Sequence, residues 1–251
     1  MLAIIGGSSL DTLAALEGAR RIEIDTPYGA PSGPLIHGRL RQREVIFLAR
    51  HGEQHQLPPH KINYRANLWA LRAQAVTHIV AVATVGGIGS EFSPGTVAVP
   101  DQIIDYTWGR ASTFFDGEGS ALDGAVKHID FTRPYDEPLR ARLLRAAQHM
   151  GAPLHAYGTY AATQGPRLET AAEISRLARD GAHLVGMTGM PEAALARELD
   201  MHYAALAVVV NAAAGTGASG QAIDLTAAEA VARTAMARVV RILIEVAADG
   251  D

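Results

Sequence analysis

Short apolar runs alternate with amphipathic segments along the whole chain. Runs rich in Val, Ile, Leu and Ala predict strands at residues 2–5, 45–49, 78–84, 96–101, 158–163, 183–185 and 203–210. Apolar residues at helical spacing predict helices at residues 63–74, 137–150, 171–179, 191–199 and 227–247. The run 204–210 is apolar throughout, which is typical of a strand covered on both faces. The pattern therefore predicts an α/β fold.

Two stretches have the composition of flexible loops. Residues 115–126 are rich in Gly and Asp, and residues 212–222 are nearly all Ala, Gly, Ser and Thr. No Pro/Ser linker, internal repeat or low-complexity block divides the chain. We therefore expect one domain over residues 1–251.

Composition narrows the class of protein. The 251 residues are 48% apolar and 19% charged, which suits one globular domain with a sizeable core. The net charge of −4, without a basic stripe, argues against a nucleic-acid surface. No apolar run of about 18 residues predicts a membrane span, and the opening strand does not resemble a leader peptide. The absence of cysteine excludes disulfides and thiolate metal sites, and makes the cytoplasm the expected compartment.

Four predicted strands end in glycine together with a small hydroxyl or a cation. Ser8, Arg50, Thr84 and Thr188 follow or close these strands. Carboxyl ends of strands border the ligand crevice in α/β sheets, and such groups hold phosphate. Each signal has a plainer interpretation, because Thr188 suits a helix N-cap and Arg50 a surface ion pair. Together they predict an anion site.

Asn211 closes the apolar run 206–211, and Glu169 lies in Gln164-Gly-Pro-Arg-Leu-Glu169. A carboxamide offers one acceptor and two donors, whereas a carboxylate only accepts. The pair suits a ring with a carbonyl beside an N–H and disfavours a ring with an amino group there. This pattern favours a 6-oxopurine over a 6-aminopurine.

Several motifs share one register with a known family. They are Ile4-Ile-Gly-Gly-Ser8, Ala49-Arg-His-Gly52, Asn63-Tyr-Arg-Ala-Asn-Leu-Trp-Ala70, Gly165-Pro-Arg-Leu-Glu-Thr170 and Gly186-Met-Thr-Gly-Met-Pro-Glu192. The chain resembles the trimeric purine nucleoside phosphorylase and methylthioadenosine phosphorylase family from about residue 3 to residue 245. Within it, Tyr28-Gly-Ala-Pro31 and Ile129-Asp-Phe131 are most similar to the bacterial S-methyl-5′-thioinosine phosphorylases. The resemblance implies a homotrimer with a central mixed, twisted sheet flanked by helices.

The resemblance also implies roles for single residues. Phosphate would contact Ser8, Arg50, His51, Thr84 and Thr188. The family often has a hydroxyl residue before Thr84, and Ala83 stands there in this chain. Methylthioadenosine phosphorylases typically use aspartates near Asn211, and this chain has Ala213 there. The remaining nucleoside contacts would be Met187 under the ribose, Glu169 and Asn211 at the base, and His128 from a neighbouring subunit at the 5′ end. Leu225 would line the 5′ wall.

The predicted activity is phosphorolysis of S-methyl-5′-thioinosine to hypoxanthine and 5-methylthioribose 1-phosphate, within purine and methylthio salvage. Asn211 and Glu169 would take part in catalysis, phosphate would be the co-substrate, and no metal or cofactor is expected. A broad purine nucleoside phosphorylase and a methylthioadenosine phosphorylase remain alternatives. A hydrolytic nucleosidase and a non-catalytic nucleoside-binding protein are further ones.

Overall fold

A ten-stranded mixed sheet forms the centre of the computed structural model, which describes residues 1–10, 12–117, 122, 126–152, 154–217 and 222–248. The main path runs β2-β3-β4-β1-β5-β9-β8-β7, and β10 pairs with both β5 and β6. The strands are β1 (Leu2–Gly6), β2 (Glu17–Ile22), β3 (Leu35–Leu40), β4 (Arg43–Ala49), β5 (His78–Gly87), β6 (Val97–Ala98), β7 (Gln102–Asp105), β8 (Thr159–Ala162), β9 (Leu184–Gly186) and β10 (His202–Ala212).

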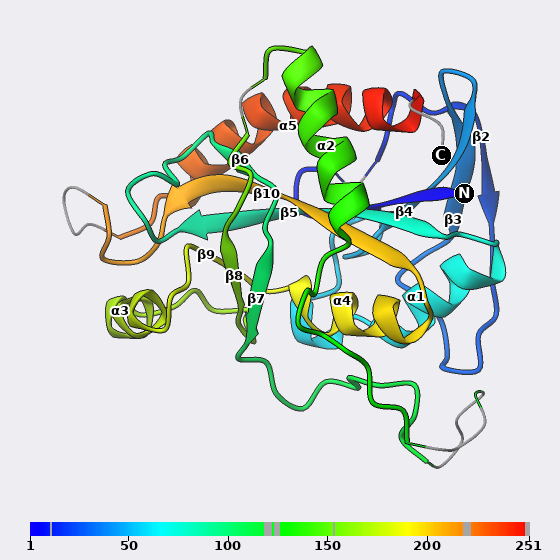
Figure 1. Cartoon of the computed structure of the whole chain (residues 1–251), viewed down its shortest axis with the longest axis horizontal. Coiled ribbons are helices and arrows are strands. Elements are labelled where there is room, and N and C mark those ends of the chain that lie inside the picture. The colour runs from blue at the N-terminus through cyan, green and yellow to red at the C-terminus, as the bar shows by residue number, and fades with distance from the viewer. Residues whose placement is uncertain (11, 118–121, 123–125, 153, 218–221, 249–251) are drawn as a thin grey trace.

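Helices cover both faces of the sheet (Figure 1). Helices α2 (Glu137–His149) and α5 (Leu225–Ala248) lie above it, and α1 (Tyr64–Ala73) and α4 (Gly189–Glu198) lie below. Helix α3 (Ala171–Arg179) lies beside β8 and β9, and a 3-10 turn spans Pro59–Lys61. Two large apolar clusters, one on each face, hold these layers together. The predicted single α/β domain with a mixed sheet and flanking helices is confirmed.

Four parallel strands run side by side in the middle of the sheet, in the order β4, β1, β5 and β10. Strand β1 is parallel to β4 and β5, and β5 is parallel to β10. Strand β9 meets β5 antiparallel at only two residue pairs, Gly86 with Val185 and Gly87 with Leu184. This short antiparallel pairing places β9 beside the carboxyl end of β5. The ends of five strands therefore meet around one space.

One strand prediction is partly wrong. Residues 96–101 were expected as a single strand, whereas only Val97–Ala98 forms β6 and the next strand begins at Gln102. Pro100 has no N–H to donate to a ladder, so it separates the two short strands. Strands β2 and β3 were not predicted at all. The predicted loop 115–126 lies partly outside the described residues, and so does 212–222, whose first residue ends β10.

Candidate active site

A cavity of about 320 Å³ opens at the carboxyl ends of the central strands. Its walls combine glycines, small hydroxyls and apolar side chains, which is the usual lining of a small-molecule site. Ten of the eleven side chains predicted for the site line it: Ser8, Arg50, His51, Thr84, Glu169, Met187, Thr188, Asn211, Ala213 and Leu225. The structure therefore brings these residues together around one cavity, and their roles stay predictions.

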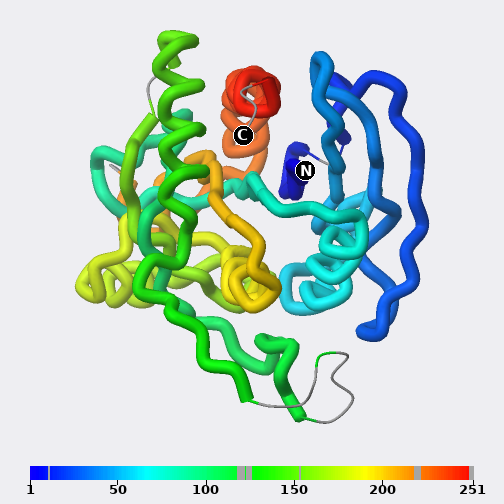
Figure 2. The backbone as a smooth tube through the Cα atoms, turned by 45° about the vertical axis from the view of Figure 1, so that its right-hand side comes forward, coloured from blue at the N-terminus to red at the C-terminus, as the bar shows by residue number. Residues whose placement is uncertain are grey.

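The exception is His128. Its side chain is exposed, and it is not among the residues that line the cavity. The segment that carries it projects below α1 and α4, whereas α5, which supplies one cavity wall, lies on the opposite face of the sheet (Figure 2). Within one subunit His128 therefore does not join the site. Its predicted role at a neighbouring subunit stays a prediction.

Arg50 is the most deeply buried of the predicted anion ligands, with 1% of its surface exposed. Its Nε and Nη2 donate to the two carboxylate oxygens of Glu192 at 2.6 and 2.9 Å, and its Nη1 donates to the carbonyl of Val82 at 3.0 Å. Burial alone would lower the Arg50 pKa, but the Glu192 carboxylate holds this pKa above its ordinary value. The interpretation of Arg50 as a surface ion pair is therefore wrong.

Thr188 lines the same cavity. Thr188 is the N-cap residue of α4 by position, but its side chain makes no capping hydrogen bond. Its N–H instead donates to the Tyr160 hydroxyl at 3.3 Å. The Thr188 hydroxyl is therefore not consumed by helix capping, and the buried N-terminus of α4 adds a favourable dipole for an anion.

Ser8 and His51 complete this side of the cavity. The Ser8 hydroxyl lies 3.4 Å from His55 Nε2, and the His51 and His55 rings stack with centroids 4.5 Å apart. His51 Nδ1 donates to the Leu57 carbonyl at 2.8 Å, because a carbonyl oxygen can only accept, and this contact orients the ring. These contacts hold the Ser8 and His51 side chains in place beside Arg50.

A β-bulge positions Asn211 at the other side of the cavity. Strand β10 pairs Val209 with Val85 but Asn211 with Gly86, so Val210 is an extra residue that changes the direction of the side chains. Asn211 Nδ2 donates to the Ala212 carbonyl at 2.8 Å, which fixes the plane of the amide. A Cβ at Gly86 would lie 3.1 Å from Val185 Cγ1, which is tighter than usual, and 3.4 Å from Asn211 Nδ2.

Glu169 is held by a residue that the sequence did not single out. Thr163 Oγ1 donates to Glu169 Oε1 at 2.6 Å. The loop returns to a helix at Thr170, whose capping box with Glu173 begins α3. Arg167 and then the Thr170 N–H hold the Glu173 pKa at about 2, so this cap stays ionised at neutral pH. The hydrogen bond from Thr163 and the capped start of α3 at Thr170 thus keep Glu169 at the cavity wall.

Arg110 joins the loops on which these side chains sit, although it does not line the cavity. Its Nη1 donates to the carbonyls of Met187 and Met190 at 2.8 and 2.6 Å. Its Nη2 donates to those of Thr163 and Gln164 at 3.2 and 2.9 Å. One guanidinium therefore connects the loop after β8 with the loop after β9.

Replacing Arg110 with lysine tests this connection. A single ammonium cannot reach all four carbonyls, so we expect the free energy of unfolding to fall by about 1.5–3 kcal/mol, the scale of a hydrogen bond to a charged group. Urea denaturation would measure the loss. Arg167→Lys, at an exposed ion pair, should change stability by less than about 0.5 kcal/mol. Equal effects in both variants would show that Arg110 is not a special connection.

The cavity meets α5 at its mouth. Leu225 is the first residue of α5 and is 62% exposed, and Ile223 lines the cavity beside it. Residues 218–221, which precede them, lie outside the described residues. Among the described residues no group of three or more His, Cys, Asp or Glu side chains is arranged to hold a metal. The prediction that no metal or cofactor is needed stays a prediction.

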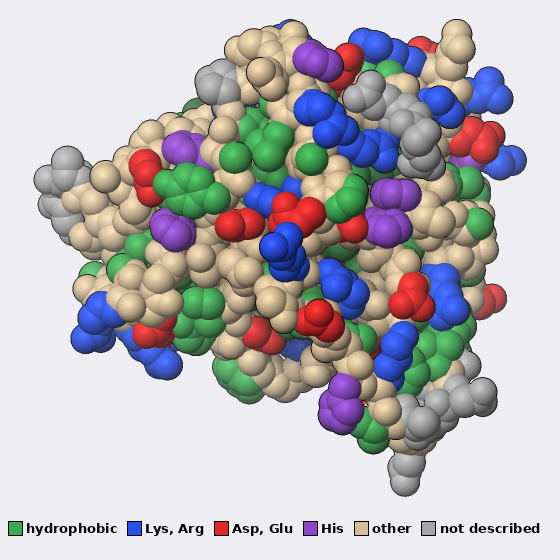
Figure 3. Space-filling view, in the orientation of Figure 1, with side chains coloured by type: hydrophobic (Ala, Val, Ile, Leu, Met, Phe, Trp, Pro, Cys, Tyr) green, Lys and Arg blue, Asp and Glu red, His purple; other side chains and the backbone are tan. Residues whose placement is uncertain are grey.

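The surface charge is mixed in sign. On the face shown in Figure 3, Lys and Arg side chains are mixed with Asp and Glu rather than gathered into one stripe. Among the helices of the described residues, none combines the length and apolarity needed to cross a bilayer.

A cavity at strand ends, with anion donors on one side and a carboxamide with a carboxylate on the other, defines an α/β protein that binds a small polar molecule. The phosphorylase superfamily matches residues 1–245, and the chain belongs to this family. It is 55% identical over 228 residues to a protein named "Probable S-methyl-5′-thioinosine phosphorylase" from Xanthomonas campestris pv. campestris, covering 91% of this chain and 88% of that protein.

Other similar proteins are also named nucleoside phosphorylases. A 6-oxopurine nucleoside phosphorylase from Pyrococcus furiosus is 49% identical over 215 residues, or 85% of this chain and 80% of that protein. Among solved structures, methylthioadenosine phosphorylase from Schistosoma mansoni in complex with adenine superposes with a TM-score of 0.94. It is 31% identical, and the alignment covers 98% of this chain and 90% of that one.

Proposed function

We propose that this protein is a pentosyltransferase that cleaves S-methyl-5′-thioinosine with inorganic phosphate, releasing hypoxanthine and 5-methylthioribose 1-phosphate. The observation that carries the proposal is that Arg50 and Thr188 share one cavity with Asn211 and Glu169. An anion site next to a base-reading pair is what a phosphorolytic enzyme needs. The names of the relatives support the same substrate class.

In the proposed reaction, phosphate attacks the anomeric carbon while the bond from that carbon to the purine nitrogen breaks. The purine leaves with the electron pair of that bond, and positive charge develops on the ribosyl ring. Catalysis then depends on positioning and electrostatics more than on covalent help. Ser8, His51, Thr84 and Thr188 would hold the phosphate with Arg50, and Met187 would pack under the sugar.

Base selection follows from the free edges of two side chains. One Nδ2 hydrogen of Asn211 bonds to Ala212, and the other hydrogen and Oδ1 make no hydrogen bond with any described residue. The amide would donate to O6 or N7 of the purine. Glu169 Oε2 likewise makes no hydrogen bond with a described residue and would accept the N1–H. An adenine ring would instead present N1 as an acceptor to Glu169, which costs binding.

The 5′ end of the substrate is proposed from the chemistry of the wall. Ile223, Leu225 and Ala228 line the cavity near α5, and apolar side chains suit a methylthio group better than a hydroxyl. We also propose a homotrimer in the cytoplasm, in which His128 of one subunit reaches the 5′ end in its neighbour. The exposed position of His128 in the single subunit is compatible with that role.

A substrate panel tests the proposal directly. With phosphate present, turnover should fall in the order methylthioinosine, inosine, methylthioadenosine, adenosine. The release of free base measures turnover for each substrate. An apolar pocket discriminates by roughly 1–3 kcal/mol per methylene-sized change, so inosine should be about 10- to 100-fold slower. Equal rates on methylthioadenosine and methylthioinosine would contradict the base assignment. Turnover without phosphate would instead identify a nucleosidase, and binding without release of base a non-catalytic protein.

A further inference from the structure

Beneath the cavity, a buried carboxylate is paired with the only arginine or lysine that lines it among the described residues. Glu192 has 0% of its surface exposed and accepts two hydrogen bonds from Arg50 and one from the Tyr203 hydroxyl at 2.8 Å. Burial, and then Glu192, raises the Tyr203 pKa well above its ordinary value, so this hydroxyl stays protonated. Glu192 does not line the cavity.

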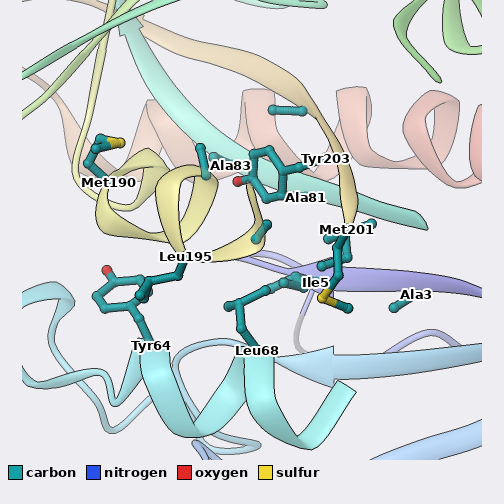
Figure 4. Packing of buried hydrophobic residues seen from close by; sticks show 14 of the residues in the cluster. Ala3, Ile5, Tyr64, Leu68, Ala81, Ala83, Met190, Leu195, Met201 and Tyr203 are labelled. Carbon is teal, nitrogen blue, oxygen red and sulfur yellow. The ribbon is translucent and has the colours of Figure 1, made fainter. Parts of the chain in front are cut away.

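Tyr203 enters this cluster from β10, and its hydroxyl is directed toward α4 (Figure 4). Glu192 lies in the first turn of α4, four residues after Thr188. A carboxylate is normally favoured near a helix N-terminus by the dipole. The start of α4, where the backbone is non-helical at Met190, therefore carries an anion-binding hydroxyl and, four residues later, a fixed negative charge.

The hydrogen bonds of Arg50 leave one of its edges unused. A guanidinium has five N–H donors in a planar fork. Glu192 takes the edge formed by Nε and Nη2, and the Val82 carbonyl takes one hydrogen of Nη1. One hydrogen remains on each of Nη1 and Nη2, and the edge between these two nitrogens is free of the Glu192 carboxylate. That edge matches two oxygens of a phosphate in a bidentate contact.

The pairing also removes the net charge of the arginine. Arg50 with Glu192 is formally neutral, and the predicted phosphate contacts Ser8, Thr84 and Thr188 are uncharged hydroxyls that lie beside the His51 imidazole. A phosphate dianion would therefore enter a site that binds it through hydrogen bonds and leaves most of its charge uncompensated. The negative charge of the phosphate would then stabilise the positive charge that develops on the neighbouring ribosyl ring.

From this arrangement we infer that Glu192 is a positioning residue with an electrostatic task. It directs one edge of Arg50 at the phosphate and cancels the arginine charge, so that bound phosphate keeps its negative charge for the transition state. The inference rests on the proposed phosphorolysis. Tight binding of the ground state alone would not accelerate the reaction, because only interactions that strengthen in the transition state do so.

Glu192→Gln removes the charge while keeping the size and one acceptor oxygen. Phosphate should then bind more tightly to the uncompensated Arg50, so we expect the KM for phosphate to fall about tenfold. At the same time kcat should fall about 10- to 100-fold, the scale of one charge-assisted hydrogen bond. The KM for methylthioinosine should change less than about threefold, since Asn211 and Glu169 are untouched.

Glu198→Gln is a matched control on the same helix. Glu198 is also buried, at 6% exposed, and accepts from Thr113 Oγ1 and the Phe114 N–H at the far end of α4. Its replacement should reduce stability but leave kcat and both KM values nearly unchanged. If both variants lost stability and kcat to the same extent, Glu192 would matter only for folding. That result would overturn the inference. So would a phosphate KM that stays constant or rises in Glu192→Gln.

A second variant covers the case in which Glu192→Gln does not fold. Glu192→Asp keeps the charge but shortens the side chain, which breaks the bidentate contact. Here we expect the phosphate KM to rise about tenfold with the methylthioinosine KM unchanged, the opposite sign to the glutamine variant. An unchanged phosphate KM, or equal rises in both KM values, would overturn the inference. Phosphate-dependent turnover of the wild-type enzyme tests the proposed function separately.

Discussion

Asn211→Asp should reverse the base preference of this enzyme. A carboxylate at position 211 repels O6 of an oxopurine and accepts from the amino group of an aminopurine. It also no longer donates toward N7 as negative charge develops on the leaving purine. Losing one preorganised donor costs roughly 3 kcal/mol, so kcat on methylthioinosine should fall at least about a hundredfold. Turnover of methylthioadenosine should rise, and initial rates on both substrates measure the switch.

The control for this variant is Asn63→Asp, which makes the same chemical change at the N-cap of α1. Asn63 does not line the cavity, so the ratio of rates on the two substrates should stay at the wild-type value. If Asn211→Asp also kept the wild-type ratio, Asn211 would not read the base. The position of Asn211 after a bulge makes this test specific, because its side chain faces the cavity and not the core.

The elements that the sequence predicted well are those whose burial leaves a regular apolar pattern. The predicted helix 171–179 matches α3 in both boundaries, because a capping box begins it and Gly181 follows its end. Strand β2 was missed because Glu17–Ile22 is an edge strand that is largely exposed and carries two arginines. Charged edge strands show no alternation of apolar residues. The apolar pattern of a segment thus indicates whether the segment is buried, but not whether it pairs with another strand.

The cavity was predictable for a different reason. Glycines and small hydroxyls at strand ends are local features, and the carboxyl ends of neighbouring strands must meet. The sequence does not predict a role for Glu192, although it lies in a family motif, because its partner Arg50 is 142 residues away in the chain. The same holds for Arg110, whose carbonyl partners Thr163 and Met187 lie 53 and 77 residues away. Their function lies in contacts between loops, which no spacing in the sequence encodes.

Arg50→Met should have the largest effect on activity of any single change at the site. The variant loses both N–H groups directed at the phosphate, and we expect kcat/KM for phosphate to fall about a thousandfold. It also leaves the Glu192 carboxylate buried with Tyr203 as its remaining partner. An unpaired buried charge costs about 3–5 kcal/mol, so the free energy of unfolding should fall by that amount. Denaturant melts and phosphate titrations measure the two effects separately.

The double variant Arg50→Met with Glu192→Leu separates stability from catalysis. Replacing a buried ion pair by apolar residues of similar volume is often neutral for stability. We therefore expect the double variant to recover most of the lost free energy of unfolding while its activity stays as low as that of Arg50→Met. Recovery of phosphorolysis together with stability would mean that Arg50 only supports the fold. Persistent inactivity in a stable protein would show that the phosphate is held by Arg50 itself, because the cavity then keeps every other donor.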